Sequence, residues 1–482
     1  MSGISRVIDA VARPLASTEG RKRALILLVA GPLALAFAVG AVLGAVSEAG
    51  SWSPLALAAA AALVAIGAGA CGRVLLRTAQ RIRGRQGTAW IPEKLRPLAL
   101  DVSAAEPRRI DIVHPAIDLK HFFGGFIAVF NLALRLTERG HRVRLIATEA
   151  SNLPTDWRQR ISAYEGLGAG LDQIEVAFAE GREPVPINPA DTLIATHWTV
   201  AHIAHAAAVE LGQDRFVYLI QEYEPFIFPL GSAAALAAES YELPHRAIFS
   251  TALLRDYFAQ RQVGVFAAGA AGERDSVVFD NAITAVGPVD AEDLRRQGRP
   301  RLLFYARPEE HAQRNLFELG TMALDRAVGE GTLQGWDLVG VGTVEPGSGP
   351  LVLPDSGARV EMVPRSAQAD YADLLRSCDV GLALMYTPHP SLVPIEMAAA
   401  GMVTVTNTYE NKDAAALASI SSNLVAAKPT VAGIAAGLGA AVAVASDLGA
   451  RAAGSNVAWP SNWDEALGDA VLSRLDGWIQ RG

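Results

Sequence analysis

The sequence predicts an α/β protein in which two domains, each built on a parallel β-sheet, follow a pair of transmembrane helices. Three observations indicate this architecture. Short β-rich runs alternate with helical patterns between residues 109 and 427, the alternation restarts near residue 299, and two long uncharged apolar runs lie near the N-terminus. The chain has 482 residues and a mean hydropathy of +0.23, which is high for an enzyme without a membrane segment.

The two apolar runs cover residues 24–46 and 49–72, and neither contains a charged residue. Each is longer than the roughly 20 residues that span a bilayer, and the very short connector predicts a helical hairpin. A signal peptide followed by a buried helix is the alternative, but a second span follows at once and no cleavage site is convincing. The positive-inside preference places both ends, and the rest of the chain, in the cytoplasm. The flanking basic residues are Arg6, Arg13, Arg21, Lys22 and Arg23 before the hairpin, and Arg73, Arg77, Arg81, Arg83 and Arg85 after it.

Composition excludes several classes of protein. A formal net charge of −8 argues against broad nucleic-acid binding. The two cysteines, Cys71 and Cys378, lie far apart in different kinds of segment, which excludes a disulfide framework and gives no zinc-type spacing. A reducing cytoplasm is the simpler reading. The sequence contains no D-x-D motif, so an aspartate pair of that kind for chelating a metal is missing.

The alternation after the linker predicts two Rossmann-like halves whose ligands bind at the carboxyl ends of the strands, in a cleft between the domains. A turn-rich, charged stretch at 285–299 separates them. The predicted strands are residues 109–115, 141–148, 191–198, 215–224 and 246–251 in the first half, and 301–307, 336–342, 358–364, 379–385, 402–407 and 423–427 in the second.

Other segments complete the expected organisation. The alanine- and glycine-rich run 431–446 predicts a packed helix of a soluble domain, and the last residues predict one amphipathic helix capped by Ser461 or Asn462. The expected parts are an N-terminal segment (1–23), the hairpin (24–72), a basic linker (73–106), a first domain (107–290), a second domain (291–455) and a C-terminal helix that packs back on the first domain (456–482).

Candidate site residues of the first domain follow its predicted strands. Gly124 and Gly125 open a helix and allow a ligand to approach the backbone, although they are equally consistent with a simple turn. His197 ends a strand and either contacts a hydroxyl of a substrate or is structural. Gln221, Glu222 and Glu224 end the next strand, where the two carboxylates are either a pair in the cleft or a solvated strand end.

Candidate site residues of the second domain include two arginines and a carboxylate. Arg307 and Arg314 flank one strand end, where forked guanidinium groups suit a diphosphate, although surface charge is the alternative. Glu396 falls in the first turn of a helix, where the macrodipole favours a carboxylate that can accept hydrogen bonds from ribose hydroxyls. The preceding Ser391, Leu392 and Val393 can offer backbone N–H groups to a phosphate.

These residues resemble a known family. The stretches 301–318, "RLLFYARPEEHAQRNLFE", and 388–407, "PHPSLVPIEMAAAGMVTVTN", look like the donor domain of GT-B glycosyltransferases of the family-4 type. The stretches "HFFGGFIAVFNLAL", "YLIQEYEPFIFPLGS" and "PSLVPIEMAAAG" are similar to bacterial rhamnosyltransferases of the WsaF type. The resemblance covers residues 108–475 and implies a GT-B fold, two Rossmann-like domains facing a cleft, with the transmembrane hairpin outside it.

The resemblance also implies roles for single residues. It places Glu396 on the ribose of the nucleotide, Arg307 and Arg314 on the donor diphosphate, and Gly124 with Gly125 near the donor phosphate or the acceptor. Family-4 enzymes carry two glutamates spaced E-x7-E, and the first would fall at Pro388. Recognition of the donor sugar must therefore differ here, and we expect other residues of this loop, His389 and Tyr386, to bind the donor.

The resulting expectation is a membrane-anchored glycosyltransferase of the bacterial inner membrane, with cytoplasmic catalytic domains. By resemblance it moves L-rhamnose from dTDP-rhamnose to a lipid-linked or growing glycan, with retention of anomeric configuration and without a metal or other cofactor. A degenerate GT-B module that binds a glycan or nucleotide sugar in an assembly complex is the main alternative, and a nucleotide-sugar epimerase a weaker one. Nucleic acid is not an expected partner, and homo-oligomerisation stays open.

Overall fold

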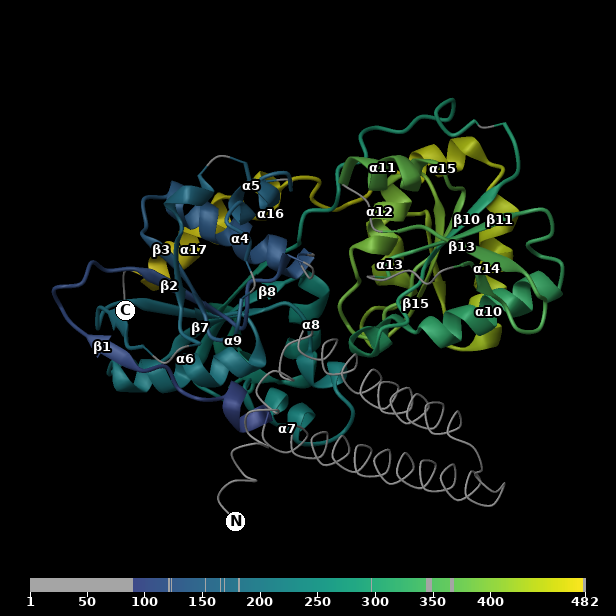
Figure 1. Ribbon diagram of the computed structural model, residues 1–482. Coiled ribbons are helices and arrows are strands. Elements are labelled where there is room, and N and C mark those ends of the chain that lie inside the picture. The colour runs from purple at the N-terminus through teal and green to yellow at the C-terminus, as the bar shows by residue number, and fades with distance from the viewer. Residues whose placement is uncertain are drawn as a thin grey trace, which may run out of the picture. The chain divides into compact units, whose positions relative to one another are not determined.

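The computed structural model describes residues 90–119, 122, 124–151, 153–164, 166–168, 170–180, 183–295, 297–343, 349–364 and 368–479 (Figure 1). The predicted hairpin at 24–72, its basic flanks and residues 1–23 lie outside the described residues. Residues 92–482 form one compact unit. Figure 1 shows two β-sheets in this unit, each with helices packed on both faces.

In the described part of the chain the first sheet has seven strands in the order β4-β3-β2-β6-β7-β8-β9, and all neighbours are parallel. Every residue of β2, β3 and β7 is buried, as expected for strands covered by helices on both faces. Its strands are β2 (Ile110–His114), β3 (Val143–Ala147), β4 (Glu175–Phe178), β6 (Thr192–Ala195), β7 (Phe216–Ile220), β8 (His245–Ser250) and β9 (Ser276–Phe279).

The helices of the first domain connect these strands, and a small parallel pair, β1 (Leu100–Val102) with β5 (Val185–Ile187), lies beside the main sheet. The α-helices are α4 (Gly124–Glu138), α5 (Trp157–Ile161), α6 (Trp198–Glu210), α7 (Ser232–Glu239), α8 (Ala252–Arg261) and α9 (Ala271–Arg274). The short 3-10 helices are η3 (Leu171–Gln173), η4 (Glu224–Ile227) and η5 (Gly264–Phe266).

The second sheet has seven described strands in the order β12-β13-β11-β10-β14-β15-β16, parallel throughout except for the edge pair β12 and β13. Its strands are β10 (Arg301–Tyr305), β11 (Asp337–Val341), β12 (Leu351–Val352), β13 (Arg359–Met362), β14 (Val380–Leu382), β15 (Val403–Asn407) and β16 (Leu424–Ala427). Its helices are η6 (Glu310–Asn315), α10 (Phe317–Gly329), α11 (Gln368–Arg376), α12 (Val393–Ala399), α13 (Ala414–Ile420), α14 (Val431–Val444) and α15 (Leu448–Gly454).

The predicted strands were correct in order but too long at several ends. β6 stops at Ala195 and β7 at Ile220, so the runs 191–198 and 215–224 continue as loops and, at Trp198, as the first residue of α6. The apolar pattern persists because the residues stay buried after the hydrogen-bonded ladder ends. The sequence pattern missed β4 and β9, whose central residues are only partly buried and therefore give a weak periodic signal.

Helix α14 packs in the core of the second domain, as the sequence predicted for the run 431–446. Ile434, Leu438 and Ala441 belong to the buried cluster that also contains Val405 of β15. Within the described residues, no single helix has both the length and the apolar character needed to cross a bilayer. The pair α14 and α15, bent by 114°, meets these two criteria only when both helices are counted together.

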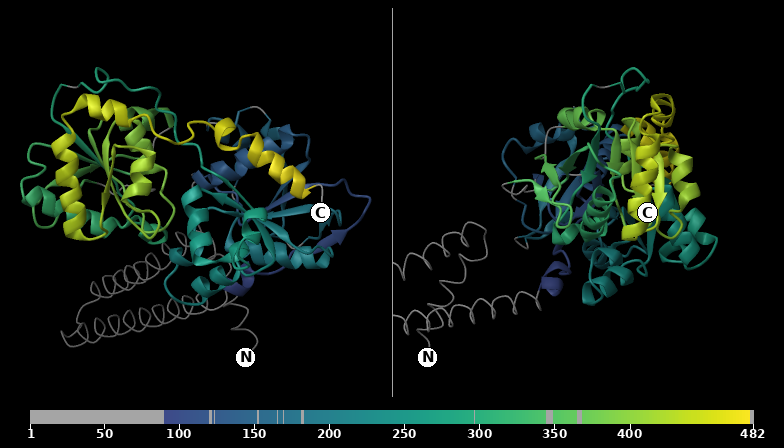
Figure 2. Two further views of the ribbon diagram at one scale, coloured as in Figure 1. Left: turned by 180° about the vertical axis from the view of Figure 1, so that it is seen from behind. Right: turned by 90° about the vertical axis from the view of Figure 1, so that its right-hand side faces the viewer.

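The C-terminal segment forms two helices, α16 (Trp463–Ala466) and α17 (Asp469–Ile479), where the sequence predicted one. Asn462 caps α16, because its side-chain oxygen accepts a hydrogen bond from the Glu465 N–H at 2.9 Å. Trp463, Leu475 and Trp478 are buried in the same cluster as residues of α4 and β2. Figure 2 shows these yellow helices lying against the first domain.

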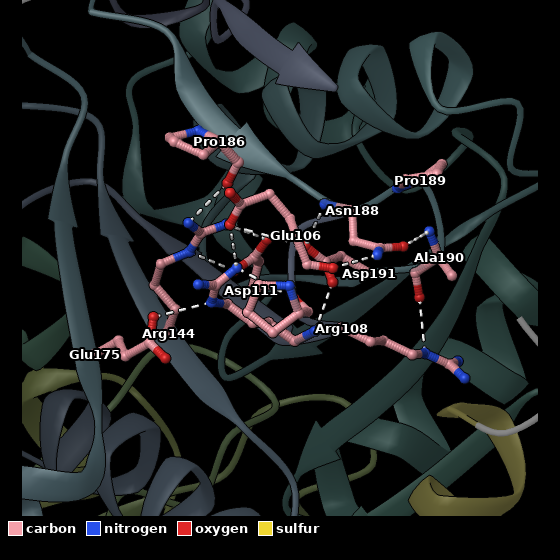
Figure 3. A network of polar contacts seen from close by, with 12 residues as sticks. Glu106, Arg108, Asp111, Arg144, Glu175, Pro186, Asn188, Pro189, Ala190 and Asp191 are labelled. Atoms are coloured by element: carbon pink, nitrogen blue, oxygen red, sulfur yellow. Dashed lines mark hydrogen bonds and ion pairs between the residues drawn. The ribbon is translucent and has the colours of Figure 1, made fainter. Parts of the chain in front are cut away.

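A buried ion pair joins strands of the first sheet at their amino ends (Figure 3). Arg144 of β3 donates from Nε and Nη2 to the two oxygens of Asp111 in β2, at 2.8 and 2.9 Å, and from Nη1 to the Pro186 carbonyl at 2.9 Å. Burial raises the pKa of Asp111 to about 6 although Arg144 opposes this shift. The network connects β5 to the main sheet at the edge opposite the carboxyl ends, so we assign it a structural role.

We expect Arg144→Met to lower the free energy of unfolding by about 3–5 kcal/mol, because it leaves the Asp111 carboxylate buried without its partner. Urea unfolding of the full chain at pH 7, followed by tryptophan fluorescence, measures the change. Arg160→Met is the matched control, since Arg160 is exposed and, within the described residues, its one ion pair is the i,i+4 pair with Asp156. It should cost about 0–1 kcal/mol. Equal effects of the two substitutions would contradict the assignment.

Candidate active site

The carboxyl ends of the strands bring the candidate residues of each domain together. In each sheet the strand order reverses at one point, between β2 and β6 in the first and between β10 and β14 in the second. Connections from the two strands at such a point leave on opposite sides and open a crevice for ligands. His197 follows β6, Arg307 follows β10 and Glu396 follows β14, so these three residues lie at the reversal points that the topology favours.

The loop from β14 to α12, residues 383–392, is called the β14–α12 loop below. Asn407 of β15 holds its start, because the side-chain oxygen accepts from the Met385 N–H at 2.7 Å and Nδ2 donates to the Met385 carbonyl at 3.0 Å. Asn315 donates from Nδ2 to the Leu384 carbonyl at 3.2 Å. Side chains therefore satisfy backbone groups that have no sheet or helix partner in this loop.

His389 and Ser391 define the far end of the loop. The Ser391 N–H donates to His389 Nδ1 at 3.0 Å, which leaves the hydrogen of the neutral ring on Nε2. Burial lowers the pKa of His389 to about 3, and the charges of Lys412 and Arg314 add to the effect. His389 is therefore a neutral donor. Ser391 has φ +65°, a backbone conformation that few residues other than glycine adopt.

The structure removes one of the three backbone N–H groups that the sequence offered to a phosphate. Because the Ser391 N–H is used by His389, this group is not open to a phosphate in the structure. Leu392 and Val393, at the start of α12, stay the predicted donors of the set. Tyr386 lies at the other end of the loop, where 46% of its surface is exposed and its ring contacts Tyr409 edge-on at 4.7 Å.

Glu396 lies in the first turn of α12, as the sequence predicted, and is buried. One carboxylate oxygen accepts from the Thr284 N–H at 3.0 Å, and the other accepts from the Tyr371 hydroxyl at 3.1 Å. Burial and this carboxylate raise the pKa of Tyr371 well above its usual value, so the phenol stays a donor. Each carboxylate oxygen keeps a second lone pair that can accept a hydrogen bond from a ribose hydroxyl. The ribose contact stays a prediction.

The two arginines differ in their surroundings. Arg307 is buried, and it donates from Nε to Glu309 Oε2 at 2.9 Å and from Nη1 to the Tyr305 hydroxyl at 3.2 Å. Arg314 donates from Nη1 to the His311 carbonyl at 3.0 Å. Its Nε is buried and has no hydrogen-bond partner among the described residues. Both arginines thus have a carboxylate nearby, Glu309 for Arg307 and Glu222 for Arg314, but only Arg307 uses its Nε in a hydrogen bond among the described residues.

Glu222 lies where the first domain meets the second. Its Oε1 accepts from the Tyr223 N–H at 3.1 Å, its Oε2 accepts from the Thr387 hydroxyl at 3.2 Å, and the same oxygen is 3.7 Å from Arg314 Nε. Burial raises the pKa of Glu222. The sequence left open whether Glu222 belongs to a pair in the cleft or to a solvated strand end. Glu222 is buried and contacts the β14–α12 loop, so it is not a solvated strand end.

His197 and Glu224 lie beside the N-terminus of α6. Glu224 Oε2 accepts from the Trp198 N–H at 2.7 Å, and His197 Nε2 is 3.8 Å from the same oxygen. Burial raises the pKa of Glu224 to about 8, and it lowers the pKa of His197, with His114 and Lys94 contributing. Burial therefore favours the neutral form of both groups. Glu224 is buried as well, and its contacts hold the start of α6 rather than the second domain.

The glycine pair faces both domains. A Cβ on Gly125 would lie 3.5 Å from the side-chain amide of Gln221, whose oxygen is buried without a partner among the described residues. A Cβ on Gly124 would lie 3.4 Å from Leu392 of the β14–α12 loop. The glycines therefore lie close to Gln221, which follows β7, and to Leu392 of the β14–α12 loop, so they are not part of a remote turn.

Comparisons with known proteins agree with this geometry. Residues 109–252 match the WsaF N-terminal domain, and residues 300–439 match the WsaF C-terminal domain. The chain belongs to the WsaF family of GT-B glycosyltransferases. The two matches together cover more than half of the chain and leave out the predicted hairpin. The E-x7-E departure at Pro388 thus occurs within a WsaF-family domain.

Two further proteins are similar to this WsaF-family chain. The O-antigen biosynthesis protein RfbC of Myxococcus xanthus is 32% identical over 370 residues, which cover 72% of this chain and 26% of RfbC. The chain thus spans about a quarter of the length of that relative. The structure of HepE from Anabaena, in complex with UDP and glucose, has a TM-score of 0.50 at 12% identity and covers 77% of this chain and 99% of HepE. That likeness shows the GT-B fold.

Sequence reasoning missed two buried titratable residues in this WsaF-family site. Lys412 follows β15 and reaches the β14–α12 loop. His114 ends β2, contacts Thr196 Oγ1 through Nδ1 at 2.6 Å and has a pKa lowered by burial to about 4. Neither has a recognisable sequence motif, although the position of His114 at a strand end was a usable signal. Among the described residues, no group of three or more His, Cys, Asp or Glu side chains is arranged to hold a metal ion.

We expect Arg314→Ala to lower kcat/KM for the donor about 100-fold, because it removes the guanidinium with an unused donor. Arg307→Ala should cost less, since the Nε of Arg307 already donates to Glu309 at 2.9 Å. Steady-state kinetics with varied donor measure both. Arg326→Ala serves as a control, because Arg326 is exposed on α10 and its one ion pair in the described part of the chain is with Glu330. A larger loss in Arg307→Ala than in Arg314→Ala would reverse the assignment.

Proposed function

We propose that the protein transfers a sugar from a nucleotide-sugar donor to a hydroxyl of a lipid-linked or growing glycan. One observation supports this most: in a chain with both WsaF domains, Arg314, Glu396 and the β14–α12 loop gather at the carboxyl ends of the second sheet. Glu222 brings the first domain to the same place. Cationic, hydrogen-bonding and carboxylate groups are the types that recognise a diphosphate, a sugar and a ribose.

The proposed donor is dTDP-L-rhamnose, by resemblance to WsaF-type rhamnosyltransferases. HepE, which shares the fold, binds UDP and glucose, so uridine nucleotides belong in any test. Glu396 accepts hydrogen bonds from the ribose, Arg307 and Arg314 offset the charge of the departing diphosphate, and His389 Nε2 donates to the donor sugar. Stabilisation of the leaving group is then the largest contribution to catalysis.

The proposed reaction needs no metal and retains the anomeric configuration. The C–O bond between sugar and diphosphate breaks, the acceptor oxygen attaches to the same carbon, and the departing phosphate oxygen takes the proton of the acceptor hydroxyl. His197, a neutral imidazole at the end of β6, contacts the acceptor or the donor sugar. Gly124 and Gly125 let the donor or the acceptor approach the α4 backbone.

The acceptor is proposed to lie at a membrane surface. The predicted hairpin, residues 24–72, would keep the catalytic domains on the cytoplasmic face of the bacterial inner membrane, where lipid-linked acceptors are found. The similarity to RfbC, which is named for O-antigen biosynthesis, supports a role in building a cell-envelope polysaccharide. The same hairpin would raise the local concentration of the acceptor at the site.

A binding module remains the second candidate, because Pro388 replaces the carboxylate that family-4 enzymes use on the donor sugar. In that case the protein would recognise a nucleotide sugar or glycan within an assembly complex without transferring sugar. An epimerase is distinguished by its product, since it would convert the nucleotide sugar in the absence of acceptor.

The deciding experiment incubates the purified full-length protein with dTDP-rhamnose, UDP-glucose or a GDP-sugar and a lipid-linked acceptor. Nucleotide release that requires the acceptor supports the transferase. Calorimetric binding without release across the panel supports the binding module, and acceptor-independent conversion supports the epimerase. Anomeric configuration of the product, read by NMR, tests retention.

We expect Glu396→Gln to raise the donor KM at least about tenfold, because a neutral amide replaces the carboxylate that accepts from Thr284, Tyr371 and the ribose. Donor-dependent kinetics and dTDP calorimetry measure the loss. Glu330→Gln, an exposed change at the end of α10, should leave both unchanged. Turnover near that of the wild type in both Glu396→Ala and Arg314→Ala would refute the proposed donor site.

Removal of residues 1–78 should reduce activity on a lipid-linked acceptor in vesicles about tenfold or more, and leave activity on a short soluble acceptor nearly unchanged. The reason is that an anchored enzyme meets the acceptor at high local concentration, whereas a free one does not. Rates on the two acceptors, measured side by side, give the ratio. An equal loss on both acceptors would count against the anchoring role.

A further inference from the structure

Lys412 is an unusual residue of the second domain, because lysine is rarely buried completely. It lies in the turn between β15 and α13, and none of its surface is exposed. The backbone of Lys412 pairs with Tyr409 in an isolated bridge, which fixes the turn. The side chain therefore leaves the turn from a defined position and points inward.

The Lys412 ammonium contacts the β14–α12 loop at two places. Nζ donates to the Met385 carbonyl and, at 3.3 Å, to the His389 carbonyl. These carbonyls stand four residues apart, so one cation joins the beginning of the loop to its far end. Tyr386, Thr387 and Pro388 lie between the two contacts.

Burial of the charged Lys412 ammonium costs free energy of desolvation, and the two carbonyl contacts offset only part of it. Burial lowers the pKa of Lys412 to about 7, and Glu222 of the first domain opposes the shift. Within the described residues no carboxylate forms an ion pair with Nζ. A buried apolar side chain would fill the space at lower cost. Packing therefore does not account for the charge, whereas the two contacts with the β14–α12 loop do.

We propose that Lys412 is a positioning residue for the nucleotide sugar: its ammonium fixes the β14–α12 loop in the conformation that binds the donor. This inference rests on the proposed function for the nature of the ligand, and on the contacts of Nζ for the role of the residue. Without the ammonium, the Met385 and His389 carbonyls lose a shared hydrogen-bond donor. The backbone that positions the His389 ring and Ser391 is then no longer fixed.

The same turn also contacts the first domain. Asn411 donates from Nδ2 to the Leu253 carbonyl at 2.8 Å, Glu410 pairs with Arg261, and the Tyr409 ring lies 5.7 Å from that of Phe226. Lys412 thus connects the loop to a segment that the first domain holds.

The test compares the full-length wild type with Lys412→Met, Lys412→Arg and the control Lys428→Met, which changes an exposed lysine after β16. Hydrogen–deuterium exchange reports the loop directly and needs no ligand. We expect at least tenfold faster exchange in residues 385–392 of Lys412→Met, without change elsewhere in the second domain. Lys412→Arg should restore most of the protection, and Lys428→Met should match the wild type.

Calorimetry with dTDP-rhamnose and UDP-glucose measures the consequence for the donor. For whichever donor the wild type binds, Lys412→Met should weaken binding about 30-fold or more, and Lys412→Arg by less than about fivefold. In kinetics the loss should appear in the donor KM rather than in the acceptor KM. A global loss of stability would instead raise exchange throughout the domain and would not be rescued by arginine.

Donor affinity should also depend on pH in a defined direction. The Lys412 ammonium loses its proton as the pH rises from 6 to 8, so wild-type affinity for the donor should fall over this range. The groups that face it are Glu222 and His389, and the charge of Arg314 acts on both of these. Because arginine stays charged, Lys412→Arg should show no such fall. A nucleotide sugar is used because its diphosphate does not titrate in this interval.

Unchanged loop exchange in Lys412→Met, or a loss that Lys412→Arg does not restore, would overturn the inference. Failure of the proposed function is distinguishable, because it appears in the wild type as absence of both donor binding and turnover. In that event the exchange measurement still decides whether Lys412 fixes the loop.

Discussion

The β14–α12 loop depends on a constraint that applies to any buried irregular segment: its backbone polar groups must find partners outside secondary structure. Here Asn315, Asn407 and Lys412 supply them. The three residues come from η6, β15 and the turn after β15, so three neighbouring segments determine one loop. The positions of Tyr386, His389 and Ser391 all follow from this arrangement.

Electrostatics at the site follow from burial more than from net charge. His389 and His197 are kept neutral by desolvation, whereas Glu222 and Lys412 lie close enough for the charge of one to favour the charge of the other. Arg314 has a buried donor without a hydrogen-bond partner among the described residues. A low-dielectric site with incomplete pairing strengthens each interaction that an anionic ligand forms there.

The sequence allowed much of the fold to be predicted, because buried parallel strands and amphipathic helices have strong patterns. The order of the main strands and the first-turn position of Glu396 agree with the structure. The ends of β6 and β7 were wrong, since burial continues beyond the ladder. The weak edge strands β4 and β9 were missed, because partly buried residues give no clear alternation.

The candidate site was less predictable, because its distinctions are tertiary. Sequence reasoning treated Arg307 and Arg314 as a pair, and only the structure shows Glu309 beside the first and a buried unused donor on the second. Lys412 stands in a turn whose letters indicate a surface position. Its importance depends on two carbonyls more than 20 residues earlier, which no local pattern reveals. The assignment of Glu222 to the site likewise depends on its hydrogen bond with Thr387 of the other domain.

The return of α16 and α17 to the first domain has a consequence for biosynthesis. Trp463, Leu475 and Trp478 complete a core that α4 and β2 began more than 300 residues earlier in the chain. A nascent chain therefore holds an unfinished apolar surface until α16 and α17 have left the ribosome. The second domain can assemble before the first is sealed. The first domain is thus synthesised before the second domain, but its core is completed after the second domain has been synthesised.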